Sequence, residues 1–459
     1  MAKKITRRSF LKGSAAAVVA SQVKMPFHSH NPNYALANSK LNIAAIGAGG
    51  KGWTDVNGCA ATENIVALAD VDQKRAAKTI GTYDKAAVYF DFREMLDKHP
   101  EIDAVTVTTP DHTHTIAADL AMSMGKHVYV QKPLTYTVAE ARHMRLKAKE
   151  SGVITQMGNQ GHSFNGVRQM KEVIDSGAIG DVKEVHIWTN RPVWPQGIPY
   201  PDVAHNVPDT LDWDLWQGPA KKRDYNRKFL PFNWRGWWEY GCGALGDMAC
   251  HIADPANMAL NLSSVGPNSV ELVMEEGNNK ATFPNKAIIK YEFPARGSQP
   301  PVTIFWYSGG NLPPRPKDIP EGDMIGEGNN GSLFVGTDGY ATCGTYGEDV
   351  RLLPDSRMKN YTMPEETIPR VQLAGDDKWR SPYAEWIDGI KTGKQPGSNF
   401  DYSGPFTEWV VMGNLSLRFP GQKLEWDAKN MKVTNNKKAN KFIHRKYHNG
   451  WELSKLKNS

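Results

Sequence analysis

Two patterns of apolar residues divide the chain. Between residues 41 and 156, short apolar runs alternate with segments in which apolar residues recur at helical spacing. The runs cover 41–47, 65–69, 87–89, 104–108, 127–130 and 153–156. Continuous apolar runs separated by helices are typical of parallel strands that are covered on both faces. The pattern predicts an α/β fold that begins with a Rossmann-type, doubly wound parallel sheet over residues 38–178.

A period of two replaces this pattern further along the chain. Polar and apolar residues alternate over 182–189, 269–274, 287–293 and 302–307, which indicates a large, open, mostly antiparallel sheet. Helices are expected over 246–262, 382–392 and 404–418. The segment 311–331 is rich in Pro and Gly and predicts a functional or interface loop. Because 459 residues exceed one ordinary domain, we place a second, α+β domain at 179–459.

The first 37 residues differ in composition from the rest. Thr6-Arg-Arg-Ser-Phe-Leu-Lys12 is typical of a twin-arginine export signal, and Ala35-Leu-Ala37 of a cleavage site. The apolar stretch 15–20 is far shorter than a membrane span. We therefore expect residues 1–37 to be a signal peptide read by the twin-arginine machinery, which exports a folded, periplasmic protein without stable membrane insertion.

The net charge of +6 belongs to this leader. Residues 1–37 hold six of the 55 basic residues and none of the 49 acidic ones, so the remainder carries no net charge. Nothing in the charge therefore favours a nucleic-acid partner. The four cysteines form neither a C-x-x-C pair nor a zinc-binding spacing, so we expect buried free thiols and no metal site.

A glycine-rich motif follows the first predicted strand. In Gly47-Ala-Gly49-Gly50-Lys-Gly52 the spacing is G-x-G-x-x-G, placed between a strand and a helix, where it is typical of pyrophosphate binding. Asp70 ends the second strand, 18 residues after Gly52, where a carboxylate binds a ribose 2′-hydroxyl. NAD is therefore the expected cofactor, with NADP as the lesser alternative because Lys74 and Arg75 are close.

Further cofactor contacts are expected where later strands end. Ligands of doubly wound sheets lie beyond the carboxyl ends of the strands. The residues at these ends are Thr108, Pro110, His114, Gln131 and Lys132. Lys132 suits contact with both cofactor and substrate, although a solvated loop lysine is an equal alternative.

One predicted helix carries polar residues at helical spacing. Asp247, His251 and Asp254 stand at i, i+4 and i+7, which places them on one face. The glycines at 241, 243 and 246 allow close approach. A carboxylate beside a histidine fixes its tautomer and suits it to proton transfer. The alternative is a surface ion pair.

Together these segments resemble the Gfo/Idh/MocA family of oxidoreductases, most of whose members act on sugars, polyols and their derivatives. The resembling stretches are 47–52, 67–72, 109–114, 125–133 and 243–251, and the ending 424–427, Asn435 and 447–451 resembles an exported subgroup. The resemblance implies that Lys132, Asp247 and His251 are catalytic. It also implies a homo-dimer or tetramer formed through the open sheet. The family's Glu-Lys-Pro motif appears here as Gln131-Lys132-Pro133, which leaves the charge partner of Lys132 open.

Seven tryptophans lie between residues 188 and 238. Aromatic faces beside polar groups suit carbohydrate binding, and we expect Arg191, Trp194 and Tyr240 to line the substrate pocket. Core and subunit packing is the alternative account for more than half of these tryptophans.

These features give three functional hypotheses. The first is an NAD(P)-dependent oxidoreductase acting on a secondary hydroxyl, with His251 as the base, Asp247 orienting it and Lys132 stabilising the oxygen. Because the periplasm holds little free NAD, the cofactor is expected to be non-dissociating and recycled. The second is an NAD-dependent glycosidase using transient oxidation and elimination, ranked lower because the resembling branch lacks the lysine motif. The third is an inactive carbohydrate-binding protein.

Overall fold

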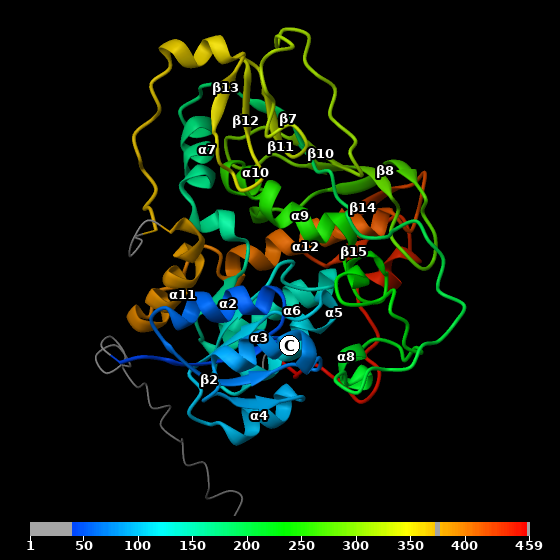
Figure 1. The fold of residues 1–459 in the computed structure, drawn as a ribbon. Helices are drawn as coiled ribbons and strands as arrows, with labels where there is room; N and C mark the ends of the chain where they lie inside the picture. Colours follow the sequence, from blue (N-terminus) through cyan, green and yellow to red (C-terminus); the bar gives the residue numbers. More distant parts are fainter. Residues whose placement is uncertain (1–38, 372–376, 457–459) are drawn as a thin grey trace, which may run out of the picture.

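The computed structural model describes residues 39–371 and 377–456, and the predicted signal peptide at 1–37 lies outside them. Two sheets dominate the fold (Figure 1). Among the described residues, no helix is long and apolar enough to cross a bilayer.

The first sheet has six parallel strands in the order β3-β2-β1-β4-β5-β6. These strands are β1 (Asn42–Ile46), β2 (Asn64–Ala69), β3 (Ala87–Tyr89), β4 (Ala104–Val107), β5 (His127–Val130) and β6 (Thr155–Met157). The helices between them are α2 (Lys51–Ala60), α3 (Gln73–Thr82), α4 (Phe92–Lys98), α5 (Asp111–Ser123) and α6 (Val138–Ser151). The strand order reverses between β1 and β4, so the loops after these strands diverge and leave room for a ligand. The predicted parallel sheet is confirmed.

The second sheet has nine strands in the order β13-β12-β11-β7-β10-β9-β8-β14-β15. Its strands are β7 (Val182–Trp188), β8 (Ser269–Glu276), β9 (Lys286–Phe293), β10 (Val302–Ser308), β11 (Gly331–Gly336), β12 (Tyr340–Cys343), β13 (Arg351–Leu353), β14 (Lys423–Asp427) and β15 (Lys432–Val433). All neighbours are antiparallel except β7 and β10. Side chains of β9 alternate between buried and half-buried, as the period of two predicts. The predicted open, mostly antiparallel sheet is confirmed.

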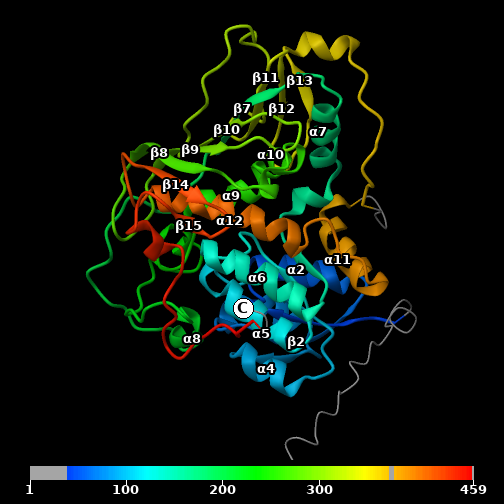
Figure 2. The ribbon, with the colours of Figure 1, turned by 180° about the vertical axis from the view of Figure 1, so that it is seen from behind.

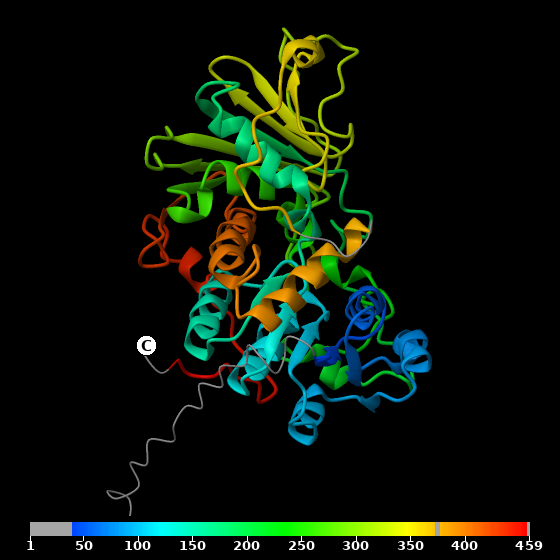
Figure 3. The same ribbon diagram turned by 90° about the vertical axis from the view of Figure 1, so that its left-hand side faces the viewer.

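Helix α12 (Phe400–Ser416) lies between the two halves of the molecule. It packs against α6 on one side and against β8 and α9 (Gly243–Ile252) on the other, as Figure 3 shows for its orange ribbon. The other helices of this half are α7 (Asn165–Asp175), α8 (Trp213–Gln217), α10 (Asp254–Ala259) and α11 (Ser381–Thr392).

Two late segments of the chain return to the first sheet. Helix α11 packs Tyr383 and Trp386 against Tyr129 of β5. The C-terminal segment then runs past α8 to α5 (Figure 2), where Arg445 donates to the carbonyl of His112 at 2.8 Å. Residues near the end of the chain therefore complete the surroundings of the six-stranded sheet.

Candidate active site

The glycine loop has the backbone that the motif predicts. Gly47 has φ 84° between β1 and α2, a conformation that strongly favours glycine. A Cβ at Gly52 would lie 2.0 Å from the carbonyl oxygen of Gly47, so only glycine fits there. The loop therefore presents bare backbone at the N-terminus of α2, which is a suitable cradle for phosphate.

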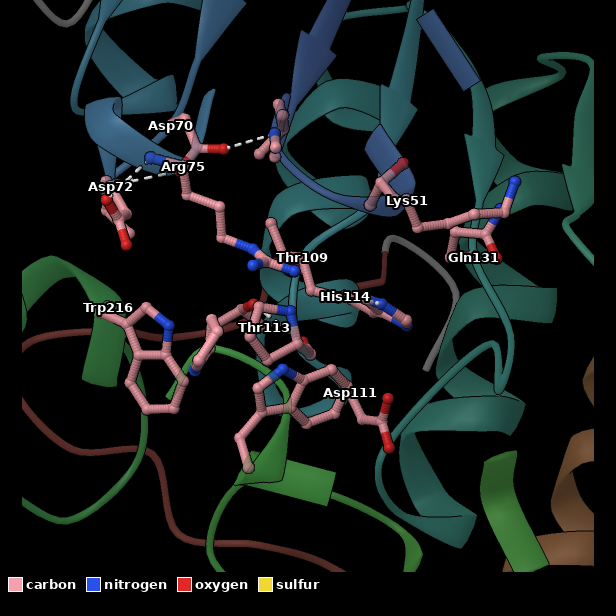
Figure 4. A pocket seen from close by; sticks show the side chains of 18 of the residues that line it. Lys51, Asp70, Asp72, Arg75, Thr109, Asp111, Thr113, His114, Gln131 and Trp216 are labelled. Carbon is pink, nitrogen blue, oxygen red and sulfur yellow. Dashed lines mark hydrogen bonds between the residues drawn. The ribbon is translucent and has the colours of Figure 1, made fainter. Parts of the chain in front are cut away.

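Asp70 holds this loop from the end of β2. Its carboxylate accepts hydrogen bonds from the backbone N–H groups of Ala48 and Gly49, both at 2.8 Å. Burial raises the pKa of Asp70, while these backbone hydrogen bonds act in the opposite direction. Arg75 extends from α3 across the loop (Figure 4), and a Cβ at Gly49 would lie 2.8 Å from its Cγ.

A cavity of about 420 Å³ runs from this loop to α9. Eight of the predicted cofactor residues line it: Gly47, Gly49, Asp70, Thr108, Pro110, His114, Gln131 and Lys132. The other half of the chain adds Trp216, Trp234, Arg235, His251, Tyr346 and Trp451, among others. Both halves of the molecule therefore build one site.

Lys132 is held by Asp247 at the α9 end of the cavity. Its Nζ donates to the carbonyl oxygen of Asp247 at 2.6 Å and to the Oδ1 of Asp247 at 2.9 Å. The Nε of Arg235 contacts the same Oδ1 at 3.2 Å. Burial acts to raise the pKa of Asp247, but Lys132 and Arg235 outweigh it and lower that pKa to about 2. Asp247 is therefore the ionised charge partner of Lys132.

His251 lies one helical turn beyond Asp247. It is only 4% exposed, and its ring meets Tyr346 edge to face at 5.1 Å between centroids. Within the described residues, its buried Nδ1 has no hydrogen-bond partner. Burial first, and then the charge of Lys132, lowers the pKa of His251 well below its ordinary value, so the imidazole is neutral. A neutral imidazole on the cavity wall is able to accept a proton.

Asp247 was predicted to orient His251, but no hydrogen bond joins the two residues. The carboxylate of Asp247 is bonded to Lys132 and Arg235 instead. The physical reason is that two cations attract a buried carboxylate more strongly than a neutral imidazole does. Asp247 therefore holds the lysine, and the histidine faces the cavity unsupported by it.

Two sequence models of one family match the chain. An "oxidoreductase family, NAD-binding Rossmann fold" model covers residues 41–159, and an "oxidoreductase family, C-terminal alpha/beta domain" model covers residues 164–297. Together these segments span more than half of the 459 residues. The chain belongs to the Gfo/Idh/MocA oxidoreductase family. The predicted family resemblance is confirmed.

Several named dehydrogenases are similar to part of this Gfo/Idh/MocA chain. Inositol 2-dehydrogenase of Pseudomonas savastanoi pv. phaseolicola is 31% identical over 158 residues, which are 33% of this chain and 46% of that protein. A 1-carboxy-3-chloro-3,4-dihydroxycyclohexa-1,5-diene dehydrogenase of Comamonas testosteroni is 34% identical over 123 residues, which are 27% and 30%. The chain thus spans less than half the length of these curated relatives.

Solved structures share the fold over most of the chain. The aldose–aldose oxidoreductase of Caulobacter crescentus, solved with glycerol, has a TM-score of 0.56 at 16% identity, covering 84% of this chain and 100% of that one. A levoglucosan dehydrogenase solved with NADH and levoglucosan has a TM-score of 0.56 at 18% identity, covering 83% and 98%. At such identities the likeness establishes the Gfo/Idh/MocA fold.

Gln131 is the position at which this Gfo/Idh/MocA chain departs from the family motif. Its Nε2 donates to both carboxylate oxygens of Asp55, at 2.9 and 3.2 Å. Lys132 forms an ion pair with Asp247 on α9, so the lysine of the motif has a carboxylate partner although the glutamate is absent.

Asp254 does not share the site with Asp247 and His251. The predicted helix 246–262 is broken: α9 ends at Ile252 and α10 begins at Asp254, because Pro255 cannot continue the preceding helix. Asp254 instead accepts hydrogen bonds from Asn159, His162 and Tyr402 in a buried cluster.

The three predicted substrate residues do not line the cavity. Arg191 follows β7 and donates to Asn190, and Trp194 donates to Gln196. Tyr240 is fully buried among aromatic rings, including Trp216 at 4.9 Å between centroids. All seven tryptophans of this region are buried, and Trp216 and Trp234 are the two that reach the cavity. Core packing thus explains most of them.

Other cavity residues were not predicted. Asp111, at the start of α5, accepts a hydrogen bond from the N–H of Cys242 at 2.9 Å, and burial raises its pKa to about 6. Its place at the first residue of the helix that follows β4 is a signal that could have found it. Arg235, Tyr346 and Trp451 carry no such local signal. The four cysteines are buried and free, as expected, and the described residues contain no group of three metal-binding side chains.

Proposed function

We propose that this protein oxidises a secondary hydroxyl group of a sugar, polyol or glycoside, using NAD that stays bound and is recycled. The observation that carries the proposal is the placement of Lys132 and His251 on the wall of the cavity that begins at the glycine loop. Lys132 is a fixed cation and His251 a neutral base, which are the two groups that alcohol oxidation requires.

The first half of the cavity fits a dinucleotide. The glycine loop offers glycine backbone at the N-terminus of α2, where the Arg75 side chain lies beside Gly49 and Gly50, and the buried Oγ1 of Thr109 has no partner among the described residues. Bound NAD would supply the hydride acceptor. The carboxylate of Asp70 disfavours a 2′-phosphate, which supports NAD, and Arg75 beside the loop keeps NADP as the lesser alternative.

The residues at the α9 end would divide the chemistry. Lys132 donates to the hydroxyl oxygen and stabilises its developing negative charge, while Asp247 fixes the direction of the ammonium. His251 takes the hydroxyl proton at its cavity face. Arg235 keeps Asp247 ionised and therefore acts through it.

Retention of the cofactor is supported by a segment that is bonded beside the cavity. The N–H of Gln73 donates to the carbonyl of Thr210 at 3.1 Å, and the N–H of Asp212 donates to the carbonyl of Val71 at 2.8 Å. The segment around residues 210–212 is therefore hydrogen-bonded to the residues that follow β2. Trp451 stacks on Phe92 at 5.7 Å between centroids on the same rim. The proposal includes periplasmic export by residues 1–37 and a homo-dimer or tetramer through the nine-stranded sheet.

The test uses protein exported and purified without added cofactor. We expect bound nicotinamide that is reduced on adding one sugar or polyol of a panel and reoxidised by a second, keto compound. Release of the aglycone from an aryl glycoside, without net change in the cofactor, would favour the glycosidase. A bound cofactor that responds to no carbohydrate would favour a binding protein. Absence of nucleotide would overturn the proposal.

A further inference from the structure

One buried carboxylate anchors the cavity wall from behind. Asp55 of α2 is fully buried and is not among the cavity-lining residues. Its Oδ1 accepts from Tyr383 at 2.7 Å and from Lys51, and its Oδ2 accepts from Thr108 at 2.7 Å. Gln131 donates to both oxygens. Asp55 is therefore saturated with donors and touches no ligand itself.

Three of these donors line the cavity. Lys51 begins α2, Thr108 follows β4 and Gln131 follows β5, so Asp55 ties the start of its own helix to two loops around the cavity. Figure 4 shows Lys51 and Gln131 at the side of the cavity away from Asp72 and Trp216. Since Lys132 is the next residue after Gln131, the Asp55 cluster lies at the reactive end.

The amide at position 131 fits this carboxylate and a second carboxylate would not. An ionised glutamate there would place two buried negative charges within hydrogen-bond distance, which is strongly unfavourable. The amide nitrogen of Gln131 instead donates at 2.9 Å. The contact between residues 55 and 131 therefore contains a single carboxylate, that of Asp55 in α2.

We infer that Asp55 is a positioning residue that sets the electrostatic balance at the nicotinamide end of the cavity, with Gln131 adapted to it. This inference rests on the proposed binding of NAD. Lys51 is the only cation bonded to Asp55 among the described residues, so the pair is neutral together. If Asp55 loses its charge, the ammonium of Lys51 is left uncompensated on the wall. The oxidised nicotinamide ring is cationic and the reduced ring is neutral, so this change disfavours the oxidised form.

The test is a redox titration of the bound nicotinamide in the purified holoprotein. Asp55→Asn should raise its reduction potential by about 30 mV, equivalent to a tenfold shift toward the reduced form for a two-electron couple. The double variant Asp55→Asn with Gln131→Glu exchanges the carboxylate and the amide between positions 55 and 131. Its reduction potential should return toward the wild-type value and differ from it by no more than about a third of that shift.

Tyr383→Phe is the matched control, because it removes a donor to the same Asp55 oxygen, and an acceptor of Lys51, without changing the charge of the cluster. It should lower the midpoint of thermal unfolding and leave the potential unchanged. Should Asp55→Asn fail to fold, Lys51→Met tests the same balance with opposite sign and should lower the potential.

The outcomes separate the two proposals. A wild-type protein without bound nicotinamide contradicts the proposed function, and this inference falls with it. If the wild-type protein holds nicotinamide and the Asp55 and Lys51 variants have its reduction potential, the proposed function stands and this inference is overturned. A shift in Asp55→Asn that the double variant does not reverse also overturns it, since Gln131 would then not be adapted to the carboxylate.

Discussion

The two halves of the cavity are built in different ways. In the cofactor half, short contiguous motifs follow strands β1, β2, β4 and β5, and hydrogen bonds such as that from the Gly49 N–H to the Asp70 carboxylate fix them. In the substrate half, single side chains come from distant segments around 216, 234 and 346. The first half depends on the sheet, whereas the second depends on aromatic packing. Perturbations of the two halves should therefore differ in kind.

Lys132 connects the two halves, and its loss should have the largest effect. Lys132→Met removes the fixed cation and should lower kcat about a thousandfold while NAD remains bound. Steady-state kinetics and the nicotinamide absorbance of the purified protein measure both quantities. Lys126→Met is the control: Lys126 is a half-buried lysine before the same strand, its Nζ donates to the carbonyl of Pro100 outside the cavity, and the variant should keep wild-type turnover. Turnover within a factor of ten of wild type in Lys132→Met would remove Lys132 from the mechanism.

His251 is the next test, because it belongs to the substrate half. His251→Gln should lower kcat about a hundredfold through loss of the base. Burial and Lys132 lower the pKa of His251, and a base is active when deprotonated. The wild-type rate should therefore stay level as pH falls through the ordinary histidine value of 6.5, and decline only in more acidic solution. A decline centred near that ordinary value would contradict the buried, neutral imidazole.

Asp254 tests whether the helix break separates site from core. In Asp254→Asn, an amide NH₂ replaces one of the carboxylate oxygens that accept hydrogen bonds from Asn159, His162 and Tyr402. One of these donors then has no acceptor, which should lower the free energy of unfolding by about 2 kcal/mol. The midpoint of thermal unfolding should fall by about 2 °C. Turnover should match wild type at a temperature where both are folded. A selective loss of kcat would return Asp254 to the site.

These contrasts explain what the sequence could predict. The glycine loop, Asp70 and Lys132 were predictable because strand ends and turn chemistry are local properties. The helix that carries Asp247 and His251 was predicted, but its extent and the hydrogen bonding of Asp247 were not. Pro255 was present as a local signal for the helix break. The contact of Asp247 with Arg235 depends on tertiary packing, because the two residues are 12 positions apart in the sequence. Tertiary packing also determines that Trp216 lines the cavity and Trp194 does not.

Trp451 gives the smallest expected effect and tests the roof of the cofactor half. Its ring stacks on Phe92, and the guanidinium of Arg93 lies 4.1 Å from its centroid. These contacts close the rim without hydrogen bonds to the glycine loop. Trp451→Ala should therefore speed release of bound NAD about tenfold, in proportion to the lost aromatic and cation–π contacts, and leave kcat at saturating NAD unchanged. Phe442→Ala, a half-exposed aromatic of the same C-terminal segment outside the cavity, is the control. Equal release rates in the two variants would show that retention does not depend on this rim, and would shift the cause to the segment that pairs Asp212 with Val71.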